Sequence, residues 1–288
     1  MNARTGAPPD GGRAAPIGTG RPLASRHAAG RAAEDPRARV RADVRWIPRQ
    51  HGAWAMLAVP FLLGILAGRP SAWQGLLAVT AASGYLASSA ALDWTRARRA
   101  AYLRPAAVFG ALFLASGLVL LATLPRLWPI AAAAALAALV ALGAAVAGHP
   151  RSLVASLAQA ADALLLVPAA ALVSGPVAGA PVARATLVAG LYLVSSILVV
   201  RSMIRERGNG AFLAASVGYH AAAVLVEAWL LPWAYAALAL VFGVRAVALP
   251  ALQARLADGP RRLRPIHLGL VELVVAALLV AVAVVVRF

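Results

Sequence analysis

The sequence has no cysteine among its 288 residues. This absence excludes disulfide frameworks, thiolate metal sites and cysteine nucleophiles, and it leaves the redox compartment undetermined. Lysine is also absent, so all 27 cationic residues are arginine, against 10 acids. Charged residues make up only 13% of the chain, and hydrophobic residues make up 62%. A soluble domain carries about a quarter charged residues, so the composition indicates a protein that spans a membrane several times.

The first 45 residues differ from the rest because they contain no long apolar run. They are rich in arginine, alanine, glycine and proline, and they cannot bury enough apolar surface to offset chain entropy. We expect residues 1–45 to form a disordered cytoplasmic arm and residues 46–288 to form a transmembrane helical domain. The arm is either a solvated tail or a segment that lies on anionic lipid headgroups, where each arginine contributes about 1 kcal/mol.

Long apolar runs dominate the remainder of the chain. Each run has about 17–24 residues, which is enough to cross a hydrocarbon layer about 30 Å thick at 1.5 Å per residue. None shows the alternating pattern of an outer-membrane barrel. We therefore predict an all-α, polytopic transmembrane bundle of about nine spans. The predicted spans are 52–68, 71–92, 105–124, 127–147, 152–175, 185–204, 211–231, 233–252 and 266–286.

The arginines between these runs predict the orientation of the chain. If the arm is inside the cell, the inner connections carry twelve arginines, and the outer ones, with the C-terminal end, carry four. Positively charged loops stay in the cytoplasm. The pattern predicts a multi-pass protein of the cell membrane with a cytoplasmic N-terminus and an external C-terminus. It also explains the net charge of +17, so we expect membrane lipids and no nucleic acid as partners.

Ionisable side chains within the spans form the candidate site, because each costs several kcal/mol in lipid unless it faces a partner or a watery cavity. Nearly all lie in the predicted inner half of the membrane, and only Glu227 stands near the outer face. We therefore predict a polar cavity open to the cytoplasm. The candidate cavity residues are Arg49, His51, Asp93, Arg96, Asp162, Arg201, Arg205, His220, Arg245, His267 and Glu272. The alternative is that these groups only join helices, for instance by pairing Asp162 with Arg245.

The first predicted span opens on a distinctive motif. The motif reads Ile47-Pro48-Arg49-Gln50-His51-Gly52-Ala53-Trp54-Ala55-Met56-Leu57 and continues through Val59-Pro60-Phe61-Leu62-Leu63-Gly64. It resembles the signature of the YwiC-like family of bacterial integral membrane proteins, and residues 93–102, 201–205 and 265–272 are similar to later landmarks of that family. The resemblance implies a bacterial inner-membrane protein but assigns no activity. An imidazole at this place, His51, suits anion binding or proton transfer near neutral pH.

A second likeness, at the level of the fold, is to UbiA-type prenyltransferases, which have nine helices and a cavity on the cytoplasmic side. That superfamily places magnesium-binding aspartate clusters after its second and sixth spans. The corresponding stretches here, 88–96 and 201–207, hold one acid each, Asp93 and Glu206, among several arginines. This is too little negative charge to hold a diphosphate through two magnesium ions, so we expect no metal and no cofactor. Arginine can still bind phosphate directly.

Three functions remain open at this stage. The favoured one is binding or carrying a small anionic or amphiphilic molecule, with the cavity arginines attracting its negative group and Asp162, His220 and Glu272 lining the path. The second is a membrane enzyme on a UbiA-like scaffold that acts on a phosphorylated lipid, with Asp93 or His51 as acid or base. The third is a structural or accessory membrane protein. The sequence does not determine catalysis or oligomeric state.

Overall fold

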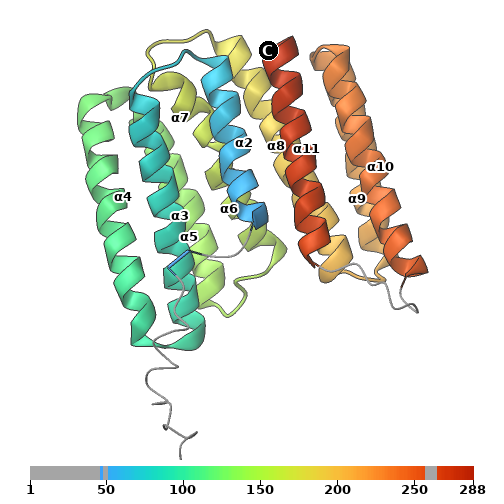
Figure 1. Ribbon diagram of the computed structural model, residues 1–288, viewed down its shortest axis with the longest axis horizontal. Helices are drawn as coiled ribbons and strands as arrows, with labels where there is room; N and C mark the ends of the chain where they lie inside the picture. Colours follow the sequence, from blue (N-terminus) through green and yellow to red (C-terminus); the bar gives the residue numbers. More distant parts are fainter. Residues whose placement is uncertain (1–45, 48–50, 257–264) are drawn as a thin grey trace, which may run out of the picture. The chain divides into compact units, whose positions relative to one another are not determined.

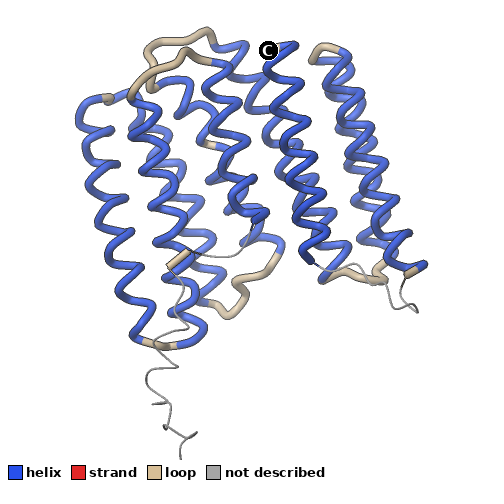
Figure 2. The backbone as a smooth tube through the Cα atoms, in the orientation of Figure 1, coloured by secondary structure: helices blue, strands red, loops and turns tan. Residues whose placement is uncertain are grey.

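A computed structural model of the chain describes residues 46–47, 51–256 and 265–288. All regular elements in these ranges are helices, and the described residues contain no strand (Figure 2). The predicted all-α class is therefore confirmed. Residues 1–45 lie outside the described ranges, so the disordered arm stays a prediction.

The helices follow one another through short connections (Figure 1). They are α2 (His51–Ala67), α3 (Trp73–Ala97), η2 (Ala100–Tyr102), α4 (Leu103–Thr123), η3 (Pro125–Leu127), α5 (Trp128–Val146), α6 (Leu153–Leu164), α7 (Leu166–Leu172), α8 (Gly179–Ile204), α9 (Gly210–Leu230), α10 (Trp233–Arg255) and α11 (Pro265–Val286). Among the described residues, eight helical segments are long and apolar enough to cross a membrane, and α2 supplies a shorter apolar helix. These match the nine predicted runs. The chain is a polytopic helical membrane protein, because a helix satisfies its own backbone hydrogen bonds in lipid.

Two predicted spans differ from the structure in detail. The run at 152–175 is divided into α6 and α7, with Leu165 between them. Pro168 has no N–H to donate to the carbonyl four residues earlier, which weakens the helix at this point. The run predicted to start at 185 is longer, since α8 already begins at Gly179. Arg184 is exposed, so its charge can extend outward from within the first turns of the helix.

Helix α2 packs very closely on α7 through two glycines. A Cβ atom at Gly64 would lie 2.8 Å from the Cβ of Ala170, and one at Gly68 would lie 2.8 Å from the Cα of Ala171. Residues four apart share one face of a helix, and small residues at this spacing are typical of close helix pairs in membranes. Gly64 ends the opening motif, so the motif positions α2 against α7.

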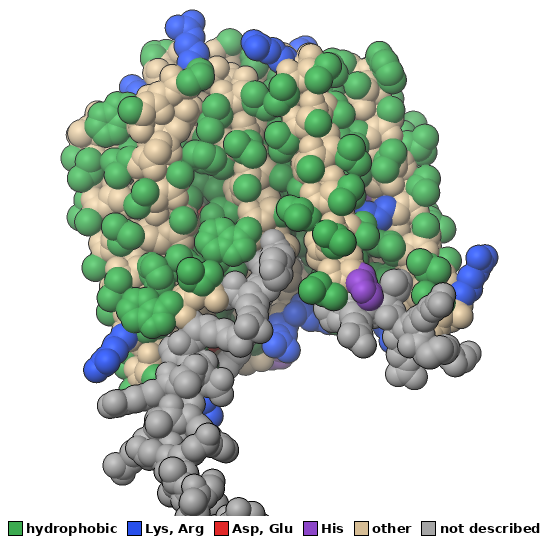
Figure 3. Space-filling view, viewed as in Figure 1, with side chains coloured by type: hydrophobic (Ala, Val, Ile, Leu, Met, Phe, Trp, Pro, Cys, Tyr) green, Lys and Arg blue, Asp and Glu red, His purple; other side chains and the backbone are tan. Residues whose placement is uncertain are grey.

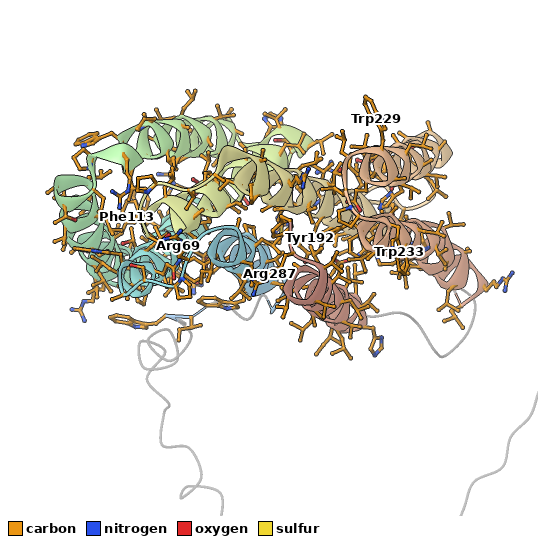
Figure 4. All side chains as sticks on the ribbon, turned by 90° about the horizontal axis from the view of Figure 1, so that it is seen from above. Arg69, Phe113, Tyr192, Trp229, Trp233 and Arg287 are labelled. Carbon is orange, nitrogen blue, oxygen red and sulfur yellow. The ribbon has the colours of Figure 1, made fainter. Side chains whose placement is uncertain are left out.

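Two apolar cores hold the remaining helices together. The larger core joins α2, α8, α10 and α11 through residues such as Leu63, Leu193 and Leu279. The smaller core joins α3, α4, η3 and α7 and includes Leu77 and Leu120. Helix α2 lies beside α11 in both views (Figures 1 and 4), and α9 packs on α8 and α10. The helices from α8 to α11 thus form one packed group, within which the polar residues described below meet.

The outer surface of the bundle suits contact with lipid. Hydrophobic side chains cover most of the face visible in Figure 3, and arginine side chains appear chiefly at its ends. Helix α5 has no buried residue. Trp229 and Trp233 are 84% and 81% exposed, and Trp229 points away from the bundle in Figure 4. Apolar side chains at such a surface are stable against lipid tails. Which end faces the cytoplasm stays a prediction from the arginine pattern.

Replacing Gly64 with alanine is expected to destabilise the protein, because the added Cβ would press on Ala170 of α7. Overpacking of this kind costs about 1–3 kcal/mol. The matched control is Gly110→Ala in α4, where a Cβ would meet no atom within 4 Å. This control should be neutral or slightly stabilising through helix propensity. Thermal unfolding of the two purified variants measures the effect, and equal midpoints would contradict a close contact between α2 and α7.

Candidate functional site

Five polar side chains from four helices meet at one buried point. They are Ser195 and Ser196 on α8, His220 on α9, Arg245 on α10 and Glu272 on α11, each no more than 6% exposed. Arg245 Nη1 donates to Glu272 Oε1 at 2.7 Å, and Arg245 Nη2 donates to Ser195 Oγ at 2.8 Å. A charge at this depth is costly unless it has such partners. We call these five side chains the buried network.

The hydrogen bonds of the buried network form a continuous chain. His220 Nδ1 donates to the carbonyl of Ser216 at 2.7 Å, since a carbonyl only accepts. Ser195 Oγ lies 2.8 Å from His220 Nε2 and can donate to it while accepting from Arg245. Ser196 Oγ donates to Glu272 Oε2 at 2.6 Å. This arrangement satisfies both imidazole nitrogens with a neutral His220, so the network has no net charge.

Small and aromatic residues explain how the network forms. A Cβ at Gly243 would lie 3.6 Å from the Cβ of His220, an ordinary van der Waals contact, so α10 packs directly on α9 beside the network. The Phe242 ring centre lies 5.4 Å from the Arg245 guanidinium carbon and 6.1 Å from the Tyr192 ring. Figure 4, seen along the helices, shows Tyr192 between α8 and α11. The aromatic rings cover the guanidinium and exclude lipid from it.

Two atoms beside the network have no hydrogen-bond partner within the described part of the chain. They are Ser216 Oγ and Arg245 Nε. Ser216 is fully buried, one turn before His220 on α9. Buried polar atoms are normally bonded to protein, ordered water or ligand. Each of these two atoms can therefore form one further hydrogen bond.

A second polar group lies where α8 ends. Arg201 Nη1 and Arg205 Nη1 each donate to the backbone carbonyl of Arg151 at 3.0 Å. Arg201 Nη2 also pairs with Glu206 Oε1 at 3.2 Å. The four-residue spacing of Arg201 and Arg205 puts them on one face of α8, as the sequence indicates. Two guanidinium groups thus converge on a single oxygen atom.

The structure brings the predicted cavity residues together in two separate groups. His220, Arg245 and Glu272 belong to the buried network, and Arg201 and Arg205 converge at the end of α8.

Asp162 belongs to neither of these two groups. It is exposed on α6, and no described residue bonds to its carboxylate. The alternative pairing of Asp162 with Arg245 is wrong, because Arg245 pairs with Glu272 on the neighbouring helix.

The other predicted cavity residues lie at the edges of the described ranges. Asp93 is half-buried near the end of α3, His267 is exposed at the start of α11, and each makes an interaction of its own. Arg49 and the side chains of His51 and Arg96 lie outside the described residues. A single cavity that is open to the cytoplasm and joins both groups therefore stays a prediction.

The sequence reasoning missed the serines of the site. Ser195, Ser196 and Ser216 bridge or border the buried network, yet none is ionisable. Serine in a membrane helix often bonds to its own backbone, so its presence alone does not mark a site. The available signal was a pair of adjacent serines in the middle of the run that ends at Arg201 and Arg205.

Comparison with known proteins bears on the family rather than on the activity. A family model described as YwiC-like protein matches residues 47–171, from the opening motif into α7. A curated relative from Bacillus subtilis (strain 168), described as "Uncharacterized protein YwiC", is 64% identical over 28 residues. That stretch covers 10% of this chain and only 12% of the relative's length. No solved structure matches the chain.

The helices define the class of this protein, and the family match covers part of it. It is a polytopic helical membrane protein. Its residues 47–171 match the model of the YwiC-like family, in agreement with the resemblance inferred from the opening motif. The buried network lies beyond residue 171, outside the matched part. The likeness to UbiA-type prenyltransferases stays a prediction.

Removing one member of the pair of Arg245 and Glu272 is expected to destabilise the protein strongly, because the opposite charge is left buried without its partner. Arg245→Met and Glu272→Leu should each cost about 3–5 kcal/mol of unfolding free energy. The double variant R245M/E272L removes both charges and should recover much of this loss. Unfolding by SDS titration measures all three variants. Losses that simply add in the double variant would show that the two side chains do not interact.

Proposed function

We propose that this protein binds or carries a small anionic or amphiphilic molecule, whose negative group is first held by Arg201 and Arg205. The observation that carries this proposal is the convergence of both guanidinium groups on the carbonyl oxygen of Arg151, at 3.0 Å each. Guanidinium groups suit the oxygen atoms of phosphates and carboxylates, because their donors are planar and always charged. An anion's oxygen can take the place that the carbonyl now occupies.

The local charge also favours an anion. Arg207 follows the converging pair in the sequence, and Arg151 supplies the carbonyl oxygen that the pair shares; both are exposed, and Glu206 is the acid paired with Arg201. An excess of cations at one end of a bundle raises the local concentration of anions. The positive-inside rule explains why arginines gather at such an end, but it does not require two guanidinium groups to share one acceptor.

Polar residues on α8 support a route from this end toward the buried network. Ser202 is buried next to Arg201 in the sequence. It lies seven residues from Ser195, about 10 Å along the helix and on the same face. Carriers also use interrupted helices near their binding sites, and the described chain has one such interruption, at Leu165.

Inorganic pyrophosphate is a suitable probe for the proposed site, because it offers phosphate oxygens without a lipid tail. In nanodiscs of zwitterionic lipid, pyrophosphate should raise the Tm of the protein. A ligand at 100 times its Kd stabilises the native state by about 2.7 kcal/mol. Arg201→Gln and Arg205→Gln should each lose most of this stabilisation, since each removes one of the converging groups.

The matched control for this titration is Arg184→Gln, which removes the same charge from the opposite end of α8. This variant should keep the full Tm shift. If R184Q and R201Q lost the pyrophosphate-induced Tm shift equally, the shift would come from general charge screening, and the proposed site would be rejected. Repeating the titration in nanodiscs of anionic lipid separates two sources of the anion, because a lipid headgroup that fills the site would abolish the pyrophosphate shift.

A further inference from the structure

One buried acid belongs to neither polar group described above. Glu227 lies three residues before the end of α9 at Leu230 and is 6% exposed. No described residue donates a hydrogen bond to its carboxylate or forms an ion pair with it. An ionised carboxylate without a partner is costly at such a place, whereas a protonated carboxyl group is not. Glu227 is therefore suited to holding a proton.

Glu227 and His220 lie on the same face of α9. The buried residues of this helix are Ser216, His220, Ala223 and Glu227, and their spacing follows one helix face. His220 and Glu227 are separated by seven residues, about 10 Å along the axis. The side chains between them on this face are the buried Ala223 and the half-buried Val224. We call these four residues the α9 stripe; it connects the buried network with the far end of the helix.

The groups that face the α9 stripe from other helices leave Glu227 available for proton exchange. Arg245 on α10 and Glu272 on α11 bond to each other. Tyr192 on α8 and Tyr235 on α10 are the buried phenols on the neighbouring helices, and the Tyr235 hydroxyl donates to the carbonyl of Arg287 at 3.2 Å.

On α9 itself, the hydroxyl of Tyr219 is also engaged. It donates to the carbonyl of Leu191 on α8 at 3.0 Å. Among these groups, Glu227 is thus a carboxyl group that forms no bond with another described residue, so no such bond holds its proton in place.

We propose that the α9 stripe is a proton path in which Glu227 and His220 bind the proton in turn. Glu227 releases its proton and becomes a carboxylate, and water carries the proton to His220 Nε2. The imidazole becomes imidazolium, and the Ser195 hydroxyl turns its hydrogen away so that its oxygen accepts from Nε2. The imidazolium then gives up its Nε2 proton to water on the side of Ser216, the Ser195 hydroxyl turns back to donate to Nε2 while Nδ1–H stays bonded to the Ser216 carbonyl, and Glu227 takes up a new proton from its own end.

Proteoliposomes that contain a pH-sensitive dye test this path. A potassium diffusion potential set with valinomycin drives protons inward, and the dye reports their entry with and without external pyrophosphate. The protein should admit protons faster than protein-free liposomes in at least one of the two conditions. Glu227→Gln and His220→Gln should both lose this gain entirely. Glu227→Asp should keep part of it, because it retains a carboxyl group at the same position.

Two results would overturn the proposal. One is proton entry no faster than in protein-free liposomes under both conditions, and the other is an unchanged rate in E227Q. If E227Q does not fold, infrared spectra of the wild-type protein replace it. These spectra should show the carbonyl stretching band of a buried carboxylic acid. The band should disappear as the pH is raised, and it should change its frequency in E227D. Absence of this band would equally overturn the path.

The proton path does not depend on the anion site at Arg201 and Arg205, and separate variants distinguish the two. E227Q should keep the pyrophosphate shift in Tm, because Glu227 is far along α9 from the end of α8. R201Q should keep the infrared band of the protonated carboxyl group. Loss of both readouts in either variant would mean that the variant is misfolded, and the conservative R201K and E227D then provide the comparison.

Discussion

The bond between Arg245 and Glu272 is the constraint on which the arrangement of α8 to α11 depends. Neither ion can remain alone in a hydrocarbon environment, so α10 and α11 must place them at one depth and facing each other. Ser195 accepts a hydrogen bond from Arg245 and is itself bonded to His220, and Ser196 donates one to Glu272. Apolar packing between membrane helices leaves their rotation and sliding weakly determined, because lipid tails are as apolar as leucine. The buried network fixes both the rotation and the sliding of four helices, α8 to α11.

The first part of the chain is held together by close backbone packing rather than by buried polar bonds. Helix α2 meets α7 through Gly64 and Gly68, whose missing side chains bring the two backbones together. This contact lies within residues 47–171, the part that matches the YwiC-like family model. The polar chemistry lies largely beyond it, on α8 to α11. The matched part of this chain therefore contains a close helix contact, whereas the buried network lies outside it, and a family likeness alone does not assign a function.

The sequence predicted the fold well because run length and hydrophobicity alone decide whether a helix can cross lipid. It also named His220, Arg245 and Glu272 as candidate cavity residues, since depth follows from counting residues along a span. Counting does not give rotation about the axis or the order of helices in the bundle. Asp162 also lies within its predicted span, but α6 is not beside α10, so the pairing was wrong. Ser195 was missed because a hydroxyl costs little in lipid and leaves no signal in composition.

The charge of the buried network links the two proposals. With a neutral His220, the positive charge of Arg245 is balanced by Glu272, and the network has no net attraction for an anion. A proton on His220 changes this balance to one positive charge, at a point where Arg245 Nε has no partner among the described residues. If both proposals hold, an anion that enters from Arg201 binds more tightly when His220 is protonated. By linkage, the anion must then raise the proton affinity of His220 by the same factor, so movement of one favours movement of the other.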